Sequence, residues 1–339
     1  MKSLLLFSIF ELCLILAGFF RRPFSEIRWM SREYTGTLKG ISMMTVLWSH
    51  VGQTCGVQHI QFIGSVGLSL FIMFSGYGLQ LSVEKNGLEN FWKRRFTGVI
   101  LPYWFAEAVG LLASGLFTWK RYLLSCFFIQ PAIGPEWFMQ FIMISYLIFY
   151  VICLVVKKED SHKTDRLKMR LLFGSFLVWF IVDGLFFAQP AMPFLKARQM
   201  ICFPFGIAIA KNKDYFEKKL SHPAVVFIGG FIGLLFMWIT QLKAVKAAPF
   251  LIQNCLSLFT LFPLALAVLT VTNRRKWLLN NSVLKWIGEI SFELYLIHMF
   301  TLQMLNNAPL SLLIFTAVTA AGAWLYHIIL QKGRQKWLT

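Results

Sequence analysis

The sequence predicts an all-α polytopic membrane protein in which about ten to eleven transmembrane helices form one bundle. Hydrophobic residues make up 57% of its 339 residues, and the mean hydropathy is +0.63. Only 14% of the residues are charged, whereas a soluble domain carries about a quarter. No segment between the apolar runs is long enough to fold separately, so we expect a single domain over residues 1–339.

Apolar stretches of membrane-spanning length recur along the whole chain. A helix needs about 20 residues to cross the hydrocarbon core, and the segments 37–52 and 198–211 are short for this. The stretch 122–130 is too short to span and is typical of a re-entrant or interfacial segment. The eleven candidate spans are 3–20, 37–52, 62–82, 97–117, 136–156, 171–188, 198–211, 223–241, 249–272, 284–305 and 309–330.

The basic residues predict the orientation of these spans. Alternate loops hold 26 of the 33 Lys and Arg residues, and the remaining loops hold seven. Because cytoplasmic loops carry the excess of basic residues, we expect the C-terminus in the cytoplasm. The net charge of +18 then acts as an insertion signal and attracts anionic lipids. We therefore expect membrane lipids as partners and no nucleic acid.

The cysteines do not indicate a metal centre. None of the six lies in a CxxC pair or at the spacing of metal ligands. Most of them lie within apolar runs, where a thiol behaves as a small hydrophobic group. We expect free thiols and no bound metal.

An apolar helix with a cation near its start and an imidazole near its end is the first candidate for chemistry. Lys39 and His50 are eleven residues apart, which is about 16 Å along a helix. This distance places His50 about halfway into a hydrocarbon core, where ionisable groups are costly. Neutral imidazole can act as a general base near neutral pH. The alternative is a buried histidine that only hydrogen-bonds a neighbouring helix.

Two further segments allow both a structural and a functional interpretation. Ser75, Tyr77 and two glycines interrupt a strongly apolar span, which suits close helix packing or a site. The cluster Lys93, Arg94 and Arg95 directly precedes another span. It is either an orientation anchor or a clamp for phosphate, which guanidinium groups bind in bidentate fashion.

The remaining candidates lie at helix ends or within late spans. Glu136 and Trp137 open the fifth span, as a solvated or ligand-binding acid beside an interfacial Trp. Ser291, Tyr295 and His298 follow at i, i+4 and i+7 and share one helix face. A polar face of this kind indicates either a cavity or a hydrogen-bonded packing seam between helices. Glu107 and Asp183 lie within spans, so each must be paired or face water.

Together these motifs resemble the integral-membrane acyltransferase family 3, bacterial O-acyltransferases that modify surface and secreted glycans. The family's basic residue, ten spacers and histidine are similar to Lys39 through His50. Thr97, Gly98 and Val99 stand where the family usually carries a second arginine. The resemblance covers about residues 36–330 and leaves the first span, 3–20, as an extra helix. The other motifs that carry it are Phe71–Tyr77, Arg94–Trp104, Trp137–Met139 and Ser291–His298.

The resemblance implies an O-acetyltransferase in the bacterial cytoplasmic membrane. Acyl-CoA, most simply acetyl-CoA, would be the donor, and a hydroxyl of a cell-surface or lipid-linked glycan the acceptor. His50 would be the general base, and polysaccharide assembly proteins would be possible partners. The implied donor-binding residues are Lys39, Lys93, Arg94 and Arg95, and the implied acceptor-binding residues are Ser75, Tyr77, Glu136, Trp137, Ser291, Tyr295 and His298.

Two other classes of function fit the same composition. A transporter or flippase for a lipid-linked sugar would line its path with the same buried polar residues. A structural subunit of a polysaccharide assembly machine would have less need of polar groups at membrane depth.

Overall fold

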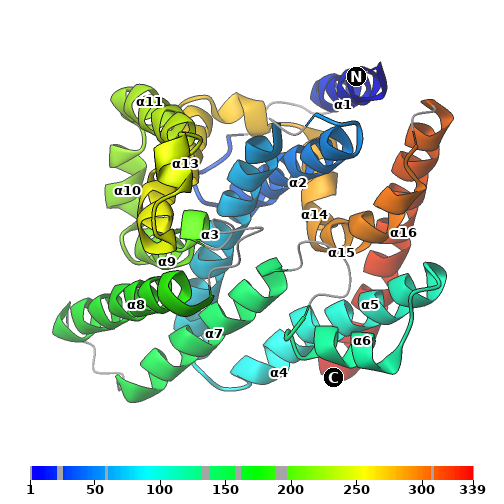
Figure 1. Ribbon diagram of the computed structural model, residues 1–339. Coiled ribbons are helices and arrows are strands. Elements are labelled where there is room, and N and C mark those ends of the chain that lie inside the picture. Colours follow the sequence, from blue (N-terminus) through cyan, green and yellow to red (C-terminus); the bar gives the residue numbers. More distant parts are fainter. Residues whose placement is uncertain are drawn as a thin grey trace. The chain divides into compact units, whose positions relative to one another are not determined.

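The computed structural model describes residues 2–20, 26–57, 60–130, 137–156, 162–187, 197–306 and 309–338. Within these ranges every regular element is a helix, which confirms the predicted all-α class. Figure 1 shows their arrangement. The elements are α1 (Lys2–Phe19), α2 (Arg32–Thr54), α3 (Gln61–Asn86), α4 (Phe91–Arg95), η2 (Phe96–Ile100), α5 (Leu101–Ala113), α6 (Trp119–Cys126), α7 (Trp137–Val155), α8 (His162–Val182), η3 (Asp183–Phe187), η4 (Ala197–Gln199), α9 (Cys202–Lys211), α10 (Lys213–Lys219), α11 (Ala224–Ile239), α12 (Lys243–Lys246), α13 (Phe250–Arg274), η5 (Lys276–Leu279), α14 (Ser282–Glu289), α15 (Ser291–Thr301), η6 (Leu302–Met304) and α16 (Pro309–Leu338).

Among the described residues, six helices are long and apolar enough to cross a membrane. A seventh span results if α10 and α11, which meet at 81°, form one broken helix. The helix α1 is apolar but shorter. The chain is therefore a helical membrane protein, but the predicted count of ten to eleven spans is not confirmed. The six are Gln61–Asn86, Phe91–Ala113, Trp137–Val155, Lys163–Phe186, Phe250–Arg274 and Leu310–Gly333.

The helices group into two compact units, and the boundary first falls within α3, between Leu68 and Ser69. Each unit combines segments that are distant in the sequence. Unit 1 consists of Met1–Leu68, Asn90–Glu136 and Trp277–Thr339, and unit 2 of Ser69–Glu89 and Trp137–Lys276.

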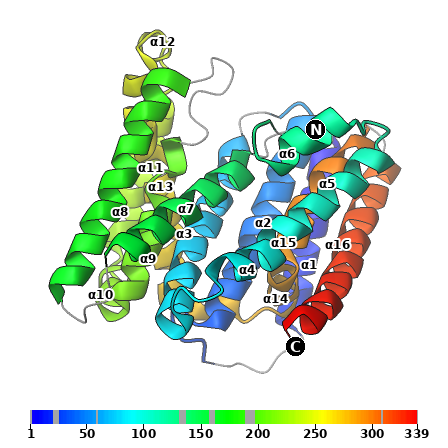
Figure 2. The same cartoon turned by 90° about the horizontal axis from the view of Figure 1, so that it is seen from below.

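In unit 1, α2 packs along α14 and also contacts α1 and α15. The helix α15 in turn contacts α5 and α16, as Figure 2 shows. Two polar contacts tie α1 to this assembly. Trp48 Nε1 donates to Ser8 Oγ at 2.7 Å, and Asn281 Nδ2 donates to the Ile15 carbonyl at 2.7 Å. A buried apolar cluster also joins α1, α2 and α16, and its members are Leu4, Phe7, Val51, Leu312 and Phe315.

Glycines set the close approach of α2 to α14. A Cβ added at Gly40 would lie 1.9 Å from the Leu284 carbonyl oxygen, and one at Gly288 would lie 1.9 Å from the Gly36 carbonyl oxygen. Both distances are far below a van der Waals contact, so only glycine fits at Gly40 and Gly288. Small residues at helix crossings allow backbones to approach in this way.

The predicted span 284–305 is divided in two. Asn281 Oδ1 accepts from the Leu284 amide at 3.0 Å and so begins α14. The helix ends at Ile290, whose backbone (φ −102°, ψ 13°) leaves the α-helical region. Ser291 Oγ then donates to the Gly288 carbonyl at 2.9 Å, which satisfies a terminal acceptor of α14. The expectation of one continuous helix is wrong at this break.

In unit 2, α11 packs along α13 (Figure 1), and α3 meets α9 at two glycines. A Cβ at Gly76 would lie 2.2 Å from the Phe203 carbonyl oxygen, and one at Gly206 would lie 1.9 Å from that of Met73. The interrupted segment that contains Ser75 and Tyr77 therefore serves helix packing through Gly76.

We predict that Gly40→Ala destabilises the protein while Gly36→Ala does not. The added methyl at Gly40 forces α2 and α14 apart, and overpacking of this kind costs about 1–3 kcal/mol. No atom lies within 4 Å of a Cβ at Gly36, and alanine there improves helix propensity. Thermal unfolding in detergent measures the difference. Equal unfolding temperatures for the two variants would contradict the close crossing.

Candidate functional site

The predicted base, His50, lies beside a second imidazole. His50 is half-buried on α2, and its ring centroid lies 5.3 Å from that of His298 on α15. The side chain of Gln53, one turn further along α2, lies near the His50 ring. Unit 1 therefore brings together two histidines that are 248 positions apart in the sequence.

The hydrogen bonds of His298 fix its tautomer. Its side chain is fully buried, and Nδ1 lies 2.7 Å from the Tyr295 carbonyl and 3.1 Å from the Leu294 carbonyl. Because carbonyl oxygens only accept, Nδ1 carries the proton and donates. Nε2 of the neutral ring is then an acceptor, and it has no hydrogen-bond partner in the part of the chain that the structure describes. A buried acceptor of this kind is available to a hydroxyl group.

Lys39 shares a helix face with His50. Eleven residues are close to three full turns, so both side chains project from one side of α2, about 16 Å apart along its axis. Lys39 is half-buried, and within the described ranges no ion pair or hydrogen bond engages its ammonium group. The single acid of α2, Glu33, pairs instead with Lys285 at 3.7 Å. The cation is therefore free to bind an anionic ligand.

The predicted phosphate clamp lies at the start of a bent helix. Lys93 is exposed, whereas Arg94 and Arg95 are half-buried. The Arg95 guanidinium lies over the Phe91 ring, 5.6 Å from its centroid. The π-helical segment η2 follows directly, and π-helical turns are frequent at functional sites. Lys39, His50 and this cluster all belong to unit 1.

The other members of the late polar stripe also lie on α15. The rings of Tyr295 and His298 are tilted by 49° with their centroids 5.7 Å apart. Ser291 is buried and donates to the Gly288 carbonyl, so its hydroxyl hydrogen already serves the helix junction. It lies two turns before His298 on α15.

The predicted residues Ser75, Tyr77 and Trp137 lie in unit 2. Ser75 Oγ and the Tyr146 hydroxyl are 2.8 Å apart, which links α3 to α7. Tyr77 is buried. Trp137 packs edge-on against Phe141, with centroids 6.2 Å apart. Glu136 lies outside the described residues.

A buried network between α5 and α6 was not evident from the sequence. Ser125 Oγ donates to Glu107 Oε2 at 2.8 Å, and the Tyr103 hydroxyl lies 2.6 Å from Ser125 Oγ. This satisfies the prediction that Glu107 must be paired. On α6, burial, a hydrogen bond with Cys126 and the charge of Glu107 raise the pKa of Tyr122 to about 12. The network fixes α6 against the adjacent span.

A second unpredicted network joins α15 to α16. His327 Nδ1 lies 3.0 Å from Glu293 Oε1, and Gln331 Nε2 lies 2.7 Å from His327 Nε2. Glu293 is 4% exposed, so the pair satisfies a buried carboxylate. A glutamate and a histidine 34 positions apart give no sequence signal that they meet.

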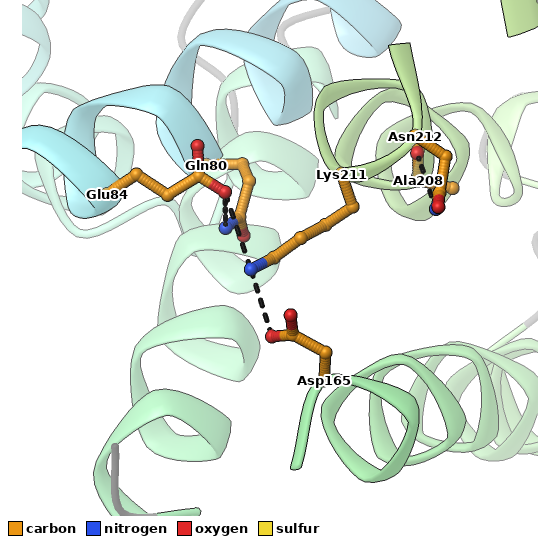
Figure 3. Close-up of polar contacts among 6 residues, drawn as sticks. All are labelled: Gln80, Glu84, Asp165, Ala208, Lys211 and Asn212. Atoms are coloured by element: carbon orange, nitrogen blue, oxygen red, sulfur yellow. Dashed lines mark hydrogen bonds and ion pairs between the residues drawn. The ribbon is translucent and has the colours of Figure 1, made fainter. Parts of the chain in front are cut away.

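The third unpredicted network, in unit 2, is shown in Figure 3. Lys211 Nζ lies between two carboxylates, 2.9 Å from Asp165 Oδ1 and 3.4 Å from Glu84 Oε1. Gln80 Nε2 donates to Glu84 Oε1 at 2.8 Å. The cluster joins α3, α8 and α9. Because every charge in it has a partner, it is an ion-pair clamp and not a site for a further ion.

Comparison with known proteins gives one family match. Residues 33–329 match the family described as an acyltransferase domain, acyltransferase family 3. The match begins within α2 and continues into α16, so both histidines lie inside it and α1 lies before it. No curated protein and no solved structure matches the chain. In the described part of the chain, no three His, Cys, Asp or Glu residues lie close enough together to hold a metal ion.

We predict that Lys211→Met lowers stability by about 1 kcal/mol or less. The side chains of Lys211, Asp165 and Glu84 are 23%, 49% and 41% exposed. Hydration of the separated charges therefore offsets most of the contribution that the ion pairs make to the free energy of unfolding. Lys213→Met, which removes a lysine just beyond α9, is the matched control. Thermal unfolding at low and high salt is the measurement. A loss of more than about 3 kcal/mol would mean that the cluster is a buried one.

Proposed function

Because the chain belongs to the integral-membrane acyltransferase family 3, we propose that it is an O-acetyltransferase with His50 as its general base. The donor is cytoplasmic acetyl-CoA, and the acceptor is a hydroxyl of a cell-surface or lipid-linked glycan. The observation that carries this proposal is the histidine pair, a half-buried His50 ring 5.3 Å from a His298 whose Nε2 has no protein partner in the described ranges. We place the enzyme in the bacterial cytoplasmic membrane with its C-terminus inside.

In the proposed reaction, His50 removes the proton from the acceptor hydroxyl as its oxygen attacks the thioester carbon. The tetrahedral intermediate collapses, the C–S bond breaks, and the thiolate of CoA takes the proton back from His50. The proton balance closes within the site. We assign to His298 Nε2, the ring nitrogen without a proton, the role of accepting a hydrogen bond from the sugar and so orienting it.

The spacing of Lys39 and His50 suits an acyl-CoA donor. The pantetheine arm between phosphate and sulfur has about twelve bonds, the length of roughly four extended residues or about 14 Å. Lys39 and His50 are about 16 Å apart along one face of α2. A phosphate held at Lys39 would therefore place the thioester close to the imidazole, and we assign Lys93, Arg94 and Arg95 to further phosphate contacts.

We predict that His50→Ala lowers kcat for acetyl transfer by about 10²–10⁴, the usual contribution of a general base. The exposed histidine of the α10–α11 junction gives a control, and His222→Ala should retain full activity. Purified variants, matched for folded protein, are assayed with radiolabelled acetyl-CoA. Full activity of His50→Ala at normal protein levels would refute the assignment.

We predict that Lys39→Met raises KM for acetyl-CoA about tenfold, or about 1.4 kcal/mol, with little change in kcat. Acetyl-pantetheine, which lacks the phosphates, should be used equally well by Lys39→Met and the parent protein. Lys85→Met, at the exposed end of α3, is the control and should change neither KM. A similar KM increase for both donors would mean that Lys39 acts on the fold and not on phosphate.

A further inference from the structure

A group of exposed cations lies where α10 and α13 end in unit 2. Within the described ranges, none of its members forms an ion pair with an acid. The neighbouring Lys276 pairs with Glu217 at 3.2 Å, so this acid of α10 is already neutralised. The surface therefore keeps an excess of positive charge. We call the group the corner cluster, and its members are Lys218, Lys219, Arg274 and Arg275.

Hydrogen bonds hold α10 against the end of α13. Asn273 Nδ2 donates to the Glu217 carbonyl at 3.0 Å. Arg274 Nη1 donates to the Ser221 carbonyl, 53 positions away in the sequence, at 2.8 Å. Two segments that are distant in the sequence thus form one surface, and the corner cluster is not a pair of independent basic loops.

The helix α10 meets α11 at 81°. When α11 crosses the membrane, α10 therefore lies along the membrane surface, where lipid headgroups are located. Tyr215 of α10 is 59% exposed, and the Lys219 ammonium lies 5.8 Å from the centroid of its ring. Tyrosine is enriched at this level of the membrane, so we expect the corner cluster among the headgroups.

An apolar stripe on α11 begins one turn after this corner. Four large side chains follow at i, i+4, i+7 and i+11, so they project from one side of the helix. The opposite side packs against α13, where Gly229 lies near Pro263 and Gly233 near Thr260. The stripe runs about 16 Å along α11 and is open to lipid chains. Its members are Phe227, Phe231, Leu234 and Trp238, which are 76%, 69%, 55% and 63% exposed.

We propose that the corner cluster and the stripe form a binding site for one anionic phospholipid. The lipid phosphate contacts Lys219 and Arg274, and the acyl chains lie along α11. Arg274 donates one of its N–H groups to the Ser221 carbonyl, and the other donors of the guanidinium fork remain for phosphate oxygens. Lys218 and Arg275 add further charge, so the site favours a lipid with two phosphates, of the cardiolipin type.

This site differs from the general attraction between basic loops and anionic lipids. The general attraction depends on net charge, so removal of any two exposed cations from one side of the membrane weakens it equally. Binding at a site depends on the members of the corner cluster. The proposal is also independent of the acetyltransferase assignment, because neither His50 nor Lys39 takes part in it.

The test compares two double variants that lose the same charge. K219Q/R274Q removes the proposed phosphate contacts, and K163Q/R170Q removes two exposed cations of α8 in the same unit. The full-length protein is delipidated in detergent and titrated with cardiolipin, and bound lipid is counted by native mass spectrometry. We expect one tightly bound cardiolipin in the parent protein and in K163Q/R170Q, and about tenfold weaker binding in K219Q/R274Q.

A third variant, K218Q/R275Q, guards against a folding defect. In the described structure neither of these side chains hydrogen-bonds the protein, so the variant should unfold at the temperature of the parent and bind cardiolipin several-fold more weakly. Soluble glycerol phosphate, which has no acyl chain, and polyglutamate, which mimics an acidic protein segment, should not raise the unfolding temperature as cardiolipin does.

Four outcomes would overturn the lipid site. Equal weakening in K163Q/R170Q would leave only an effect of net charge. Unchanged binding in K219Q/R274Q, or no binding by the parent protein, would remove the site itself. Stabilisation by glycerol phosphate or polyglutamate that equals that by cardiolipin would assign the corner cluster to a soluble phosphate or to an acidic protein segment.

Discussion

The close crossing of α2 and α14 is the constraint on which the rest of unit 1 depends. Gly40 and Gly288 carry no side chains, so at these two positions the backbones of α2 and α14 lie against each other. In a membrane, where lipid tails are as apolar as leucine, this kind of packing is what holds helices together. The crossing fixes the position of α2, which carries both Lys39 and His50. After α14, the chain turns at Ile290 into α15, which carries His298. The distance between the two imidazoles thus depends on a contact without any functional group.

Polar side chains on the helices differ in whether their neighbours satisfy them. Glu107, Glu293 and Lys211 are each satisfied by neighbours on adjacent helices, and this makes them structural. His298 Nε2 is among the buried polar atoms that have no hydrogen-bond partner in the described ranges. Unsatisfied buried groups are costly, and this one lies beside the ring of a second histidine. We take it as the place where a ligand completes the hydrogen bonding.

The sequence was sufficient for the helical class, because apolar runs of membrane length recur throughout. It also predicted that Lys39 and His50 stand about 16 Å apart along one helix, which follows from the helical rise alone. It could not predict the break at Ile290, because that depends on one hydroxyl, Ser291, bonding back to Gly288. Pairings such as Glu293 with His327 depend on which helices become neighbours, and no local pattern records that.

The central claim is that an acyl group passes from a thioester to an alcohol at the histidine pair of a membrane protein. The most direct measurement places the purified protein in liposomes with radiolabelled acetyl-CoA on one side and a lipid-linked glycan in the bilayer. The account predicts labelled glycan that releases its label under mild alkali, as an ester does, together with an equal amount of free CoA. A glycan that crosses the bilayer or stays in place without acquiring label would contradict it.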